Sequence, residues 1–403
     1  MKRTLISIII FTIFLLASLF SVEGMKSQNI NVNAIQTWTV DNEGDGDFKQ
    51  IQQAINKANP GDIIEVYSGI YKEHIKINKQ IILKGISTEL GAGEDSGKPI
   101  IDGNHFGDVM EINADGCAVS NFRIQNSGRT YSMKKGIKIT SNNCRIINNT
   151  LQNNFVGIGL SNTKNCVVAE NILFYNIFGI YATKPNNCTI SNNSLFNTGL
   201  IFSATADQLL TNTIKNNKVN NKTFYLYINK NDTTISNADA GQVEVINCNN
   251  VTIENLNIHD TSIGLITSYC SNLKIKNNTF ENIHRGGISL HGNNCEVFNN
   301  TFRNCSYGCY LEGGENFYIH HNNFIKVFKH DQPCISWIKK HQTFMESKNI
   351  IFDKNYWDDW IGLKIPSMRW MPKIIPGFRT YTHKWLNIFP IFEFDMHPAL
   401  EPY

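Results

Sequence analysis

The sequence has few charged residues and, after its first 24 residues, no long apolar run. Charged residues make up 18% of the 403 positions and form no basic block, whereas soluble domains usually carry about a quarter. We therefore expect no nucleic-acid partner, because such proteins present a basic patch or stripe. No later stretch approaches the roughly 20 apolar residues of a membrane-spanning helix. The 41% of hydrophobic residues is still enough for a real core.

Metal-binding patterns are also lacking. The ten cysteines do not have the spacing of a closed zinc site with Cys and His ligands, and no Met- or His-rich stretch indicates copper. We therefore expect no metal and no cofactor. In an exported protein, ten cysteines would first suggest disulfides, so their positions in the chain become important.

The one long apolar run lies at the N-terminus and indicates export. Lys2 and Arg3 precede an apolar run from Leu5 to Phe20, and Gly24 supplies a small residue near a cleavage point. We predict that residues 1–24 are a signal peptide, with an uncleaved membrane anchor as the alternative. In both cases the protein would work outside the cytoplasm, secreted or at the cell surface.

The rest of the chain repeats a unit of about 22 residues. The segments Asn143–Asn149, Asn187–Asn193 and Asn294–Asn300 have a small residue in second place, and the repeat positions are counted from it. Ile or Val follows at +2, Asn at +4 and +5, and an apolar residue at +7. The first position recurs at 117, 144, 166, 188, 212, 251, 273, 295, 317 and 350, with intervals of 27, 22, 22, 24, 39, 22, 22, 22 and 33. The longer intervals are what insertions into loops would produce. A second pattern, Gly followed by alternating apolar residues, lies between the copies, as in Gly287–Leu290.

This repeat predicts an all-β fold, a single-stranded right-handed parallel β-helix over residues 36–354. The unit holds three short strands of period two, and each strand can pair with its copy in the next coil at about 4.8 Å. Inward positions then stack on themselves. The paired Asn suits a sharp bend, because Asn tolerates left-handed backbone and its amide can bond its copies above and below. We expect a degenerate coil, rather than a long loop, between Asn212 and Val251.

The repeat also explains the cysteines. Other coils place Val, Leu, Phe or Ile at the inward position that is occupied by Cys144, Cys166, Cys188 and Cys295. We therefore expect stacked free thiols that act as small buried hydrophobes, although neighbouring coils would allow disulfide distances. Cys305 and Cys309 are the pair that could be an exception.

Both ends of the solenoid are expected to be capped. Asp47 precedes a helical stripe of Phe48, Ile51, Ile55 and Ala58, which ends at Pro60 and predicts an N-terminal capping helix. Residues 355–403 differ in character, and five of the six Trp lie between 337 and 385. We predict an irregular aromatic C-terminal cap, with an aromatic ligand site as the alternative.

Both ends carry family resemblances. Gly46–Ile55 and Gly69–Glu73 resemble the opening of pectin methylesterases, and more closely that of NosD-like and CASH-type (carbohydrate-binding and sugar hydrolase) β-helix proteins of the pectin-lyase-like superfamily. Asn355–Trp360 and Phe394–Tyr403 resemble the closing motifs of archaeal, surface-located NosD-like proteins. The resemblance covers about residues 38–403 and implies the fold. The esterase's Gln-rich motif and catalytic Asp motifs have no counterpart, and an aromatic, Pro-rich segment replaces a Gly/Asp-rich stretch, which argues against a calcium-type site in the tail.

The repeat register locates a candidate site. Position +8 should point outward, and reading it along the coils gives Phe174, Phe196, Asn220, His259, Glu281 and Arg303. His259, Glu281 and Arg303 would lie on successive coils, with Asp260, His284 and Arg285 beside them. These residue types suit acid–base chemistry or sugar hydroxyls, and Phe174 and Phe196 could stack on a sugar face. The alternative is a solvated face with ordinary ion pairs. His320 and His321 are expected to face opposite sides and to make a poor metal pair.

Three functions remain open. The first is binding of a polysaccharide or surface glycan at the cell surface, without a recognisable catalytic motif. The second is a polysaccharide lyase, epimerase or hydrolase, so the sequence leaves open whether the chain is an enzyme. The third, implied by the NosD resemblance, is copper delivery to a reductase.

Overall fold

The computed structural model describes residues 34–91, 93–128, 133–327, 342–344, 347–358, 373–380, 388–395, 397–399 and 401–403. The chain divides into two compact units, Met1–Ile35 and Gln36–Tyr403, and everything below concerns the second. The predicted signal peptide and 23 of the 49 residues of the predicted aromatic cap lie outside the described residues. The boundary between a solenoid at 36–354 and a cap at 355–403 therefore stays a prediction. In the described part of the chain, no helix is long and apolar enough to span a bilayer.

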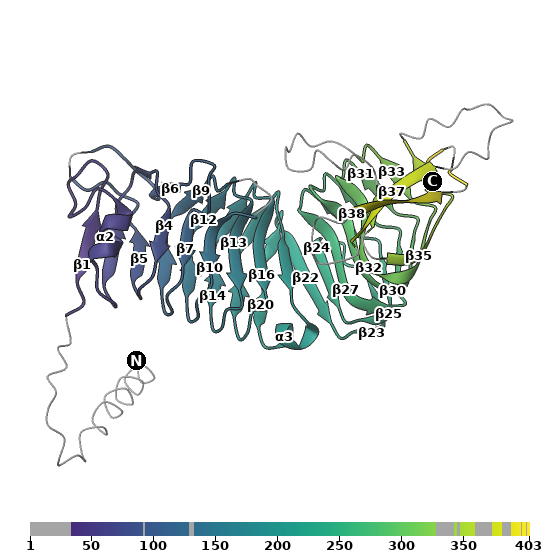
Figure 1. Cartoon of the computed structure of the whole chain (residues 1–403), viewed down its shortest axis with the longest axis horizontal. Coiled ribbons are helices and arrows are strands. Elements are labelled where there is room, and N and C mark those ends of the chain that lie inside the picture. Colours follow the sequence, from purple (N-terminus) through teal and green to yellow (C-terminus); the bar gives the residue numbers. More distant parts are fainter. Residues whose placement is uncertain are drawn as a thin grey trace, which may run out of the picture. The chain divides into compact units, whose positions relative to one another are not determined.

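The second unit is a parallel β-solenoid of about 13 turns, which confirms the predicted right-handed β-helix (Figure 1). Its N-terminal coils build three stacks of parallel strands. One stack contains β1 (Thr37–Val40), β2 (Ile63–Val66), β5 (Ile82–Gly85), β8 (Ala118–Ser120), β11 (Arg145–Ile147), β14 (Val167–Ala169), β17 (Thr189–Ser191) and β20 (Thr213–Lys215). The second contains β4 (Ile75–Ile77), β7 (Met110–Ile112), β10 (Lys135–Ile139), β13 (Val156–Ser161), β16 (Phe178–Thr183) and β19 (Leu200–Ser203). The third contains β3 (Ile70–Tyr71), β6 (Ile100–Asp102), β9 (Arg123–Gln125), β12 (Thr150–Gln152), β15 (Ile172–Phe174), β18 (Ser194–Phe196) and β21 (Lys218–Val219).

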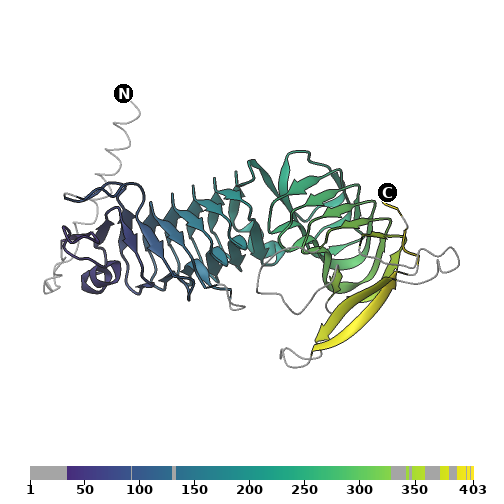
Figure 2. The same cartoon turned by 90° about the horizontal axis from the view of Figure 1, so that it is seen from above.

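The C-terminal coils continue this arrangement with longer strands. Their strands are β24 (Ala240–Ile246), β25 (Asn249–Glu254), β26 (Asn257–His259), β27 (Ile263–Ser271), β28 (Lys274–Lys276), β29 (Thr279–Glu281), β30 (Gly286–Phe298), β31 (Thr301–Arg303), β32 (Tyr307–His320), β33 (Asn323–Ile325), β34 (Gln342–Phe344), β35 (Ser347–Asp353) and β36 (Tyr356–Trp357). Neighbouring coils again pair in parallel. Figure 2 shows the antiparallel hairpin of β37 (Lys373–Thr380) and β38 (Ile388–Asp395) as a yellow ribbon beside the last coils.

The 212–251 interval contains a degenerate coil, as predicted. Strand β22 (Lys222–Ile228) turns back antiparallel to β21 and then pairs in parallel with β24, with Phe224 opposite Gln242. Strand β23 (Asn231–Ile235) pairs with β25, and a short helix, α3 (Ala206–Leu210), precedes the insertion. The first two stacks end here, at β20 and β19, and the third is linked across the interval through the antiparallel β21–β22 pair.

The N-terminal cap is confirmed as helix α2 (Ile51–Lys57), which lies beside β1 and β2 and buries Ile51, Ala54 and Ile55 (Figure 1). The helix begins four residues after Asp47, and its N-cap Gln50 makes no side-chain cap. Glu73, from the next coil, accepts hydrogen bonds from the backbone N–H of Ile51 at 2.8 Å and of Gln52 at 2.9 Å. Those helical N–H groups would otherwise lack partners, so a distant carboxylate does the capping.

Inward side chains stack on their copies, as the repeat predicts. At +7, Phe280, Phe302 and Phe324 form nearly parallel ring pairs with centroids 5.4 and 5.0 Å apart. Trp357 extends the stack at 4.2 Å. The Gly of the second pattern makes room for this column, because a Cβ on Gly287 would lie 2.5 Å from Cδ1 of Phe302. The glycine is needed for close packing rather than for an unusual backbone angle.

The two Asn at each bend have different roles. The residue at +4 takes the left-handed conformation, with φ of 57° at Asn148 and 54° at Asn299. The residue at +5 is buried and forms a ladder in which the Nδ2 of Asn300 donates to the Oδ1 of Asn322 at 3.0 Å. The ladder runs from Asn278 through Asn355 and ends on Asp395, whose Oδ2 accepts from Nδ2 of Asn355 at 3.0 Å. Burial raises the pKa of Asp395.

The cysteines in the described part of the chain are free, as predicted. All nine in the described part of the chain are buried and unbridged, and these include Cys305 and Cys309. The Sγ of Cys166 donates to the carbonyl of Ser141 at 3.4 Å, and that of Cys305 to the carbonyl of Phe280 at 3.5 Å. Burial raises the pKa of Cys305 to about 12, so its thiol stays protonated and unreactive.

Candidate functional site

The three outward residues predicted from the register lie side by side. His259 is opposite Glu281, and Glu281 is opposite Arg303, on the parallel strands β26, β29 and β31. Their polar atoms have partners within the group: His259 Nδ1 lies 2.8 Å from Asp260 Oδ2, and Arg303 Nε lies 4.0 Å from Glu281 Oε1. This pairing is what an ordinary solvated face would show. A ligand-binding role for this outward stripe stays a prediction.

The other predicted site residues are only partly gathered with the stripe. Phe174 and Phe196 are opposite one another on β15 and β18, and both are half-buried. Asn220 links this column to the stripe, because its Nδ2 donates to the carbonyls of His259 and Asp260, both at 2.9 Å. His284 lies at the turn into β30, where its N–H donates to the carbonyl of Thr261 at 3.0 Å.

Arg285 belongs to a different face. Its guanidinium carbon lies 5.1 Å from the centre of the Phe178 ring, a cation–π geometry. Phe178 lies on β16, in the stack of strands that carries the Gly pattern. The turn that carries His284 and Arg285 therefore connects the predicted stripe with a second polar group, which the sequence analysis did not identify.

This second group, the Glu244 cluster, consists of Tyr181, Glu244, Arg285, Ser289, Tyr310 and Glu312. Ser289 is opposite Tyr310 in the register of β30 and β32, and Glu244 is opposite Ile266 in the register of β24 and β27. The hydroxyl of Ser289 donates to Oε1 of Glu312 at 2.6 Å. Tyr181, Arg285 and Tyr310 are half-buried and Glu312 is exposed, so the cluster has a rim that solvent reaches.

Glu244 is the unusual member of the cluster. Its side chain is 0% exposed, and neither carboxylate oxygen has a hydrogen-bond partner. Burial raises the pKa of Glu244 well above its ordinary value, and the charge of Glu312 raises it further. The backbone N–H of Phe202 acts in the opposite direction and lowers the pKa. Burial of this kind favours the neutral form of the carboxyl, which can donate a proton or a hydrogen bond.

The other members respond to the same charges. Burial, followed by the charge of Glu312, raises the pKa of Tyr310 to about 12, and Arg285 opposes this rise. Burial also raises the pKa of Tyr181. Glu312 and Glu244 raise this pKa further, and Arg285 lowers it. Two tyrosines, an arginine, an exposed carboxylate and a buried acid therefore share one electrostatic environment. Such a set can stack on a sugar ring, bond its hydroxyls and exchange a proton.

The sequence contained a signal for this cluster. The outward position in the Gly pattern lies between its two apolar residues, and reading it along the coils gives Tyr181, Ser289 and Tyr310. Glu244 lies inside a segment that was read as a strand, but nothing local distinguishes a buried carboxyl from an exposed one. Its burial arises where β19 ends its sheet and the side chain of Gln242 bonds the backbone of Leu200, at 2.9 and 2.8 Å.

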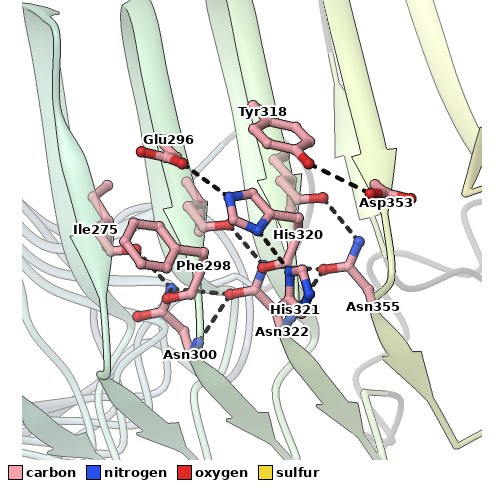
Figure 3. Close-up of polar contacts among 12 residues, drawn as sticks. Ile275, Glu296, Phe298, Asn300, Tyr318, His320, His321, Asn322, Asp353 and Asn355 are labelled. Atoms are coloured by element: carbon pink, nitrogen blue, oxygen red, sulfur yellow. Dashed lines mark hydrogen bonds and ion pairs between the residues drawn. The ribbon is translucent and has the colours of Figure 1, made fainter. Parts of the chain in front are cut away.

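A third group lies near the last coils, and it corrects a prediction. His320 and His321 do not face opposite sides: their Nδ1 atoms are 2.8 Å apart (Figure 3). Strand alternation fails here because His321 is at the +4 bend, with φ of 53°, where most other coils place Asn. His320 Nε2 also lies 3.0 Å from Oε1 of Glu296, and its ring stacks on those of Phe298 and Tyr318.

Comparisons with known proteins agree with the fold. Residues 208–355 match the family described as right handed beta helix region, and residues 75–239 match the family described as periplasmic copper-binding protein (NosD). The predicted resemblance to NosD-like β-helix proteins is therefore confirmed, while the archaeal surface type stays a prediction. No curated protein matches the chain.

Solved structures with a similar fold are remote in sequence. A lacto-N-biosidase from Eubacterium ramulus is 13% identical, with 78% of this chain and 67% of that chain covered and a TM-score of 0.37. A family 28 exopolygalacturonase from Yersinia enterocolitica is 13% identical, with coverages of 79% and 78% and a TM-score of 0.34. A mannuronan C-5 epimerase A-module from Azotobacter vinelandii is 16% identical, with coverages of 75% and 93% and a TM-score of 0.34. Similarities this weak say nothing about the function of the present chain.

Proposed function

We propose that this chain is an extracytoplasmic carbohydrate-binding β-helix protein, and that the Glu244 cluster is its binding site. The match to a family described as periplasmic and the apolar N-terminal run after Lys2 and Arg3 support export. The single observation that carries the binding site is Glu244, a fully buried carboxyl without a hydrogen-bond partner beneath a partly exposed rim.

The chemistry of the rim suits sugars. Tyrosine rings offer flat apolar faces to the C–H groups of a pyranose. Arginine and carboxylate groups bond pairs of hydroxyls, and bidentate contacts add geometric specificity. An unsatisfied buried acid costs free energy, and a ligand hydroxyl that reached Glu244 would remove part of this cost.

A glycan array probed with residues 25–403 tests the proposal. The wild-type protein is expected to bind one class of polysaccharide, and the variant Tyr310→Ala to lose at least tenfold in affinity. The matched variant Arg303→Gln alters the outward stripe instead and should bind as the wild type does. Loss of binding in Arg303→Gln alone would move the site to the stripe that the sequence predicts, and no binding to any glycan would reject the proposal.

Turnover is the first alternative within the same site. A neutral Glu244 and an exposed Glu312 differ in environment, and such pairs supply a proton donor and an acceptor in carbohydrate-active enzymes. Each bound glycan should be incubated with the protein and examined by mass spectrometry. Product formed by the wild type and abolished in Glu312→Gln, with binding retained, would make the chain an enzyme.

Copper binding is the second candidate, and the histidine pair favours it. Metal–imidazole bonds of about 2.0 Å at a right angle would place two ligand nitrogens about 2.8 Å apart, as the Nδ1 atoms of His320 and His321 are. A hydrogen bond between the rings explains the same distance. Copper(II) titration with electron paramagnetic resonance separates the two: His321→Asn, which restores the residue of the other coils, should remove a bound-copper signal if one forms. No affinity tighter than micromolar in the wild type would dismiss copper.

A further inference from the structure

Three carboxylates meet at the N-terminal end of the solenoid without a cation. Asp41 and Glu43 belong to the loop between β1 and α2, and Glu89 belongs to the loop that follows β5. One carboxylate oxygen from each lies within 4.8 Å of the others. Within the described residues, no Lys, Arg or His makes an ion pair with any of them. Like charges held this close repel one another unless a proton or a cation joins them.

Asp41 and Glu89 each have one carboxylate oxygen that is already bonded and one that is not, and Glu43 is held by Asn42. Oδ2 of Asp41 accepts from the backbone N–H of Gly44 at 2.8 Å and of Asp45 at 3.0 Å. Oε1 of Glu89 accepts from the N–H of Leu90 at 2.9 Å. The Nδ2 of Asn42 donates to Oε1 of Glu43 at 3.0 Å. These bonds fix the side chains and leave Oδ1 of Asp41, Oδ1 of Asn42 and Oε2 of Glu89 buried without partners.

The burial of Asp41 makes this more than a surface acidic cluster. Asp41 is 0% exposed, and an unsatisfied buried carboxylate oxygen is costly. These three oxygens, of Asp41, Asn42 and Glu89, are half of the six buried side-chain atoms that lack a partner in the described part of the chain. Burial, a contact with the Asp41 carboxyl and the charges of Asp41 and Glu43 raise the pKa of Glu89, as expected for carboxylates held close together.

We propose that Asp41, Glu43 and Glu89 bind a calcium ion. Only oxygen ligands are offered, which suits a hard cation. Calcium–oxygen bonds of about 2.3–2.6 Å allow ligands on opposite sides to lie about 5 Å apart, whereas magnesium requires shorter, octahedral spacing. Asp41, Glu43, Asp45 and Gly46 also follow the 1, 3, 5, 6 spacing of calcium loops. The sequence analysis predicted no metal, because Glu89 completes the group from a distant coil.

The ion would join two loops that already touch. Gly91 packs so closely against Asp45 that an added Cβ would lie 1.9 Å from Oδ2 of Asp45. Gly69 packs as closely against Asn42, where an added Cβ would lie 1.8 Å from Oδ1. The loop before α2 and the loop after β5 are therefore in contact around the carboxylates. Calcium would fasten them together and hold the N-terminal cap against the first coils. This role is independent of the carbohydrate proposal.

Terbium luminescence offers a direct test, because Tyr71 lies near the site and can sensitise the ion. The charges of Asp41, Glu43 and Glu89 all act on Tyr71. The full-length protein, stripped with a chelator, should show terbium emission that calcium reverses with one site, and 10 mM magnesium should not replace calcium. The expected affinity is on the order of 10⁻⁴–10⁻³ M, as in extracellular calcium modules.

Variants decide whether these residues form the site. Glu89→Gln should weaken calcium binding at least tenfold and abolish the calcium-induced rise in melting temperature. Glu94→Gln, the same change on an exposed side chain of the same loop, should bind as the wild type does. Asp41→Asn gives a second measurement if it folds. No calcium binding by the wild type up to 10 mM, or wild-type affinity in Glu89→Gln, would overturn the proposal and leave a protonated Glu89 as the explanation.

Discussion

Replacing Glu244 by Gln should change how the stability of the protein depends on pH. The folded chain favours the neutral form of the carboxyl, because burial raises the pKa of Glu244 well above the ordinary value of 4.5. The unfolded chain releases the proton near that ordinary value. Above it, the unfolded state binds one proton fewer than the native state, so the free energy of unfolding falls as pH rises.

The size of this effect follows from the proton count. A difference of one proton gives a slope of about −1.4 kcal/mol per pH unit between the unfolded and the folded pKa. Over that range the wild type should therefore lose about 1.4 kcal/mol per pH unit relative to Glu244→Gln, because glutamine has the same shape and does not titrate. At and below pH 4 the difference between the two proteins should become constant.

Urea unfolding at pH 4, 5, 6, 7 and 8 measures this difference directly. All other titrating groups are common to both proteins, so subtracting the two profiles isolates Glu244. Glu315→Gln, the same change on an exposed side chain, should keep the wild-type profile. Parallel profiles for the wild type and Glu244→Gln from pH 5 to pH 8 would refute the reasoning, since they would mean that Glu244 ionises as easily in the fold as in water.

Three further predictions concern the solenoid. Asn300→Ala should destabilise the protein by at least about 3 kcal/mol in denaturant unfolding, because it leaves buried ladder groups unsatisfied. The neighbouring Asn299→Gly should change stability by less than about 0.5 kcal/mol, because Gly accepts the left-handed backbone. Equal costs for the two variants would reject the interpretation that the two Asn have different roles. Gly287→Ala should lower the melting temperature strongly, because the new Cβ overlaps the ring of Phe302, and an unchanged melting temperature would contradict the packing argument. Asp395→Asn should be more stable than the wild type at pH 7 and lose this advantage below pH 4, because burial raises the pKa of Asp395; thermal unfolding at both pH values shows whether the sign is right.

The fold could be predicted because the residues that contact one another in a solenoid recur at a regular spacing in the sequence. Each inward residue meets its own copy about 22 residues away, so the recurrence of Ile, Phe and Cys reports packing directly. The same register placed His259 opposite Glu281. The degenerate coil was predicted because Phe224–Ile228 and Gln242–Ile246 both have sequences typical of strands.

The candidate sites depend on contacts that the repeat does not encode. Glu244 is buried where the second stack of strands ends at β19. There the side chain of Gln242, rather than another strand, bonds the backbone of Leu200, and the repeat does not predict where such an end occurs. The prediction that His320 and His321 face opposite sides was wrong, because His321 has a left-handed backbone conformation that interrupts strand alternation. Glu89 reaches Asp41 across loops of different coils, whose lengths vary independently of the core.

The most direct test of the proposed function is a crystal structure of the protein with an oligosaccharide that the glycan array selects. The proposal predicts a sugar ring against Tyr181 and Tyr310, with a hydroxyl within hydrogen-bonding distance of Glu244 or Glu312. A sugar bound instead along His259, Glu281 and Arg303, with the Glu244 cluster empty, would contradict it.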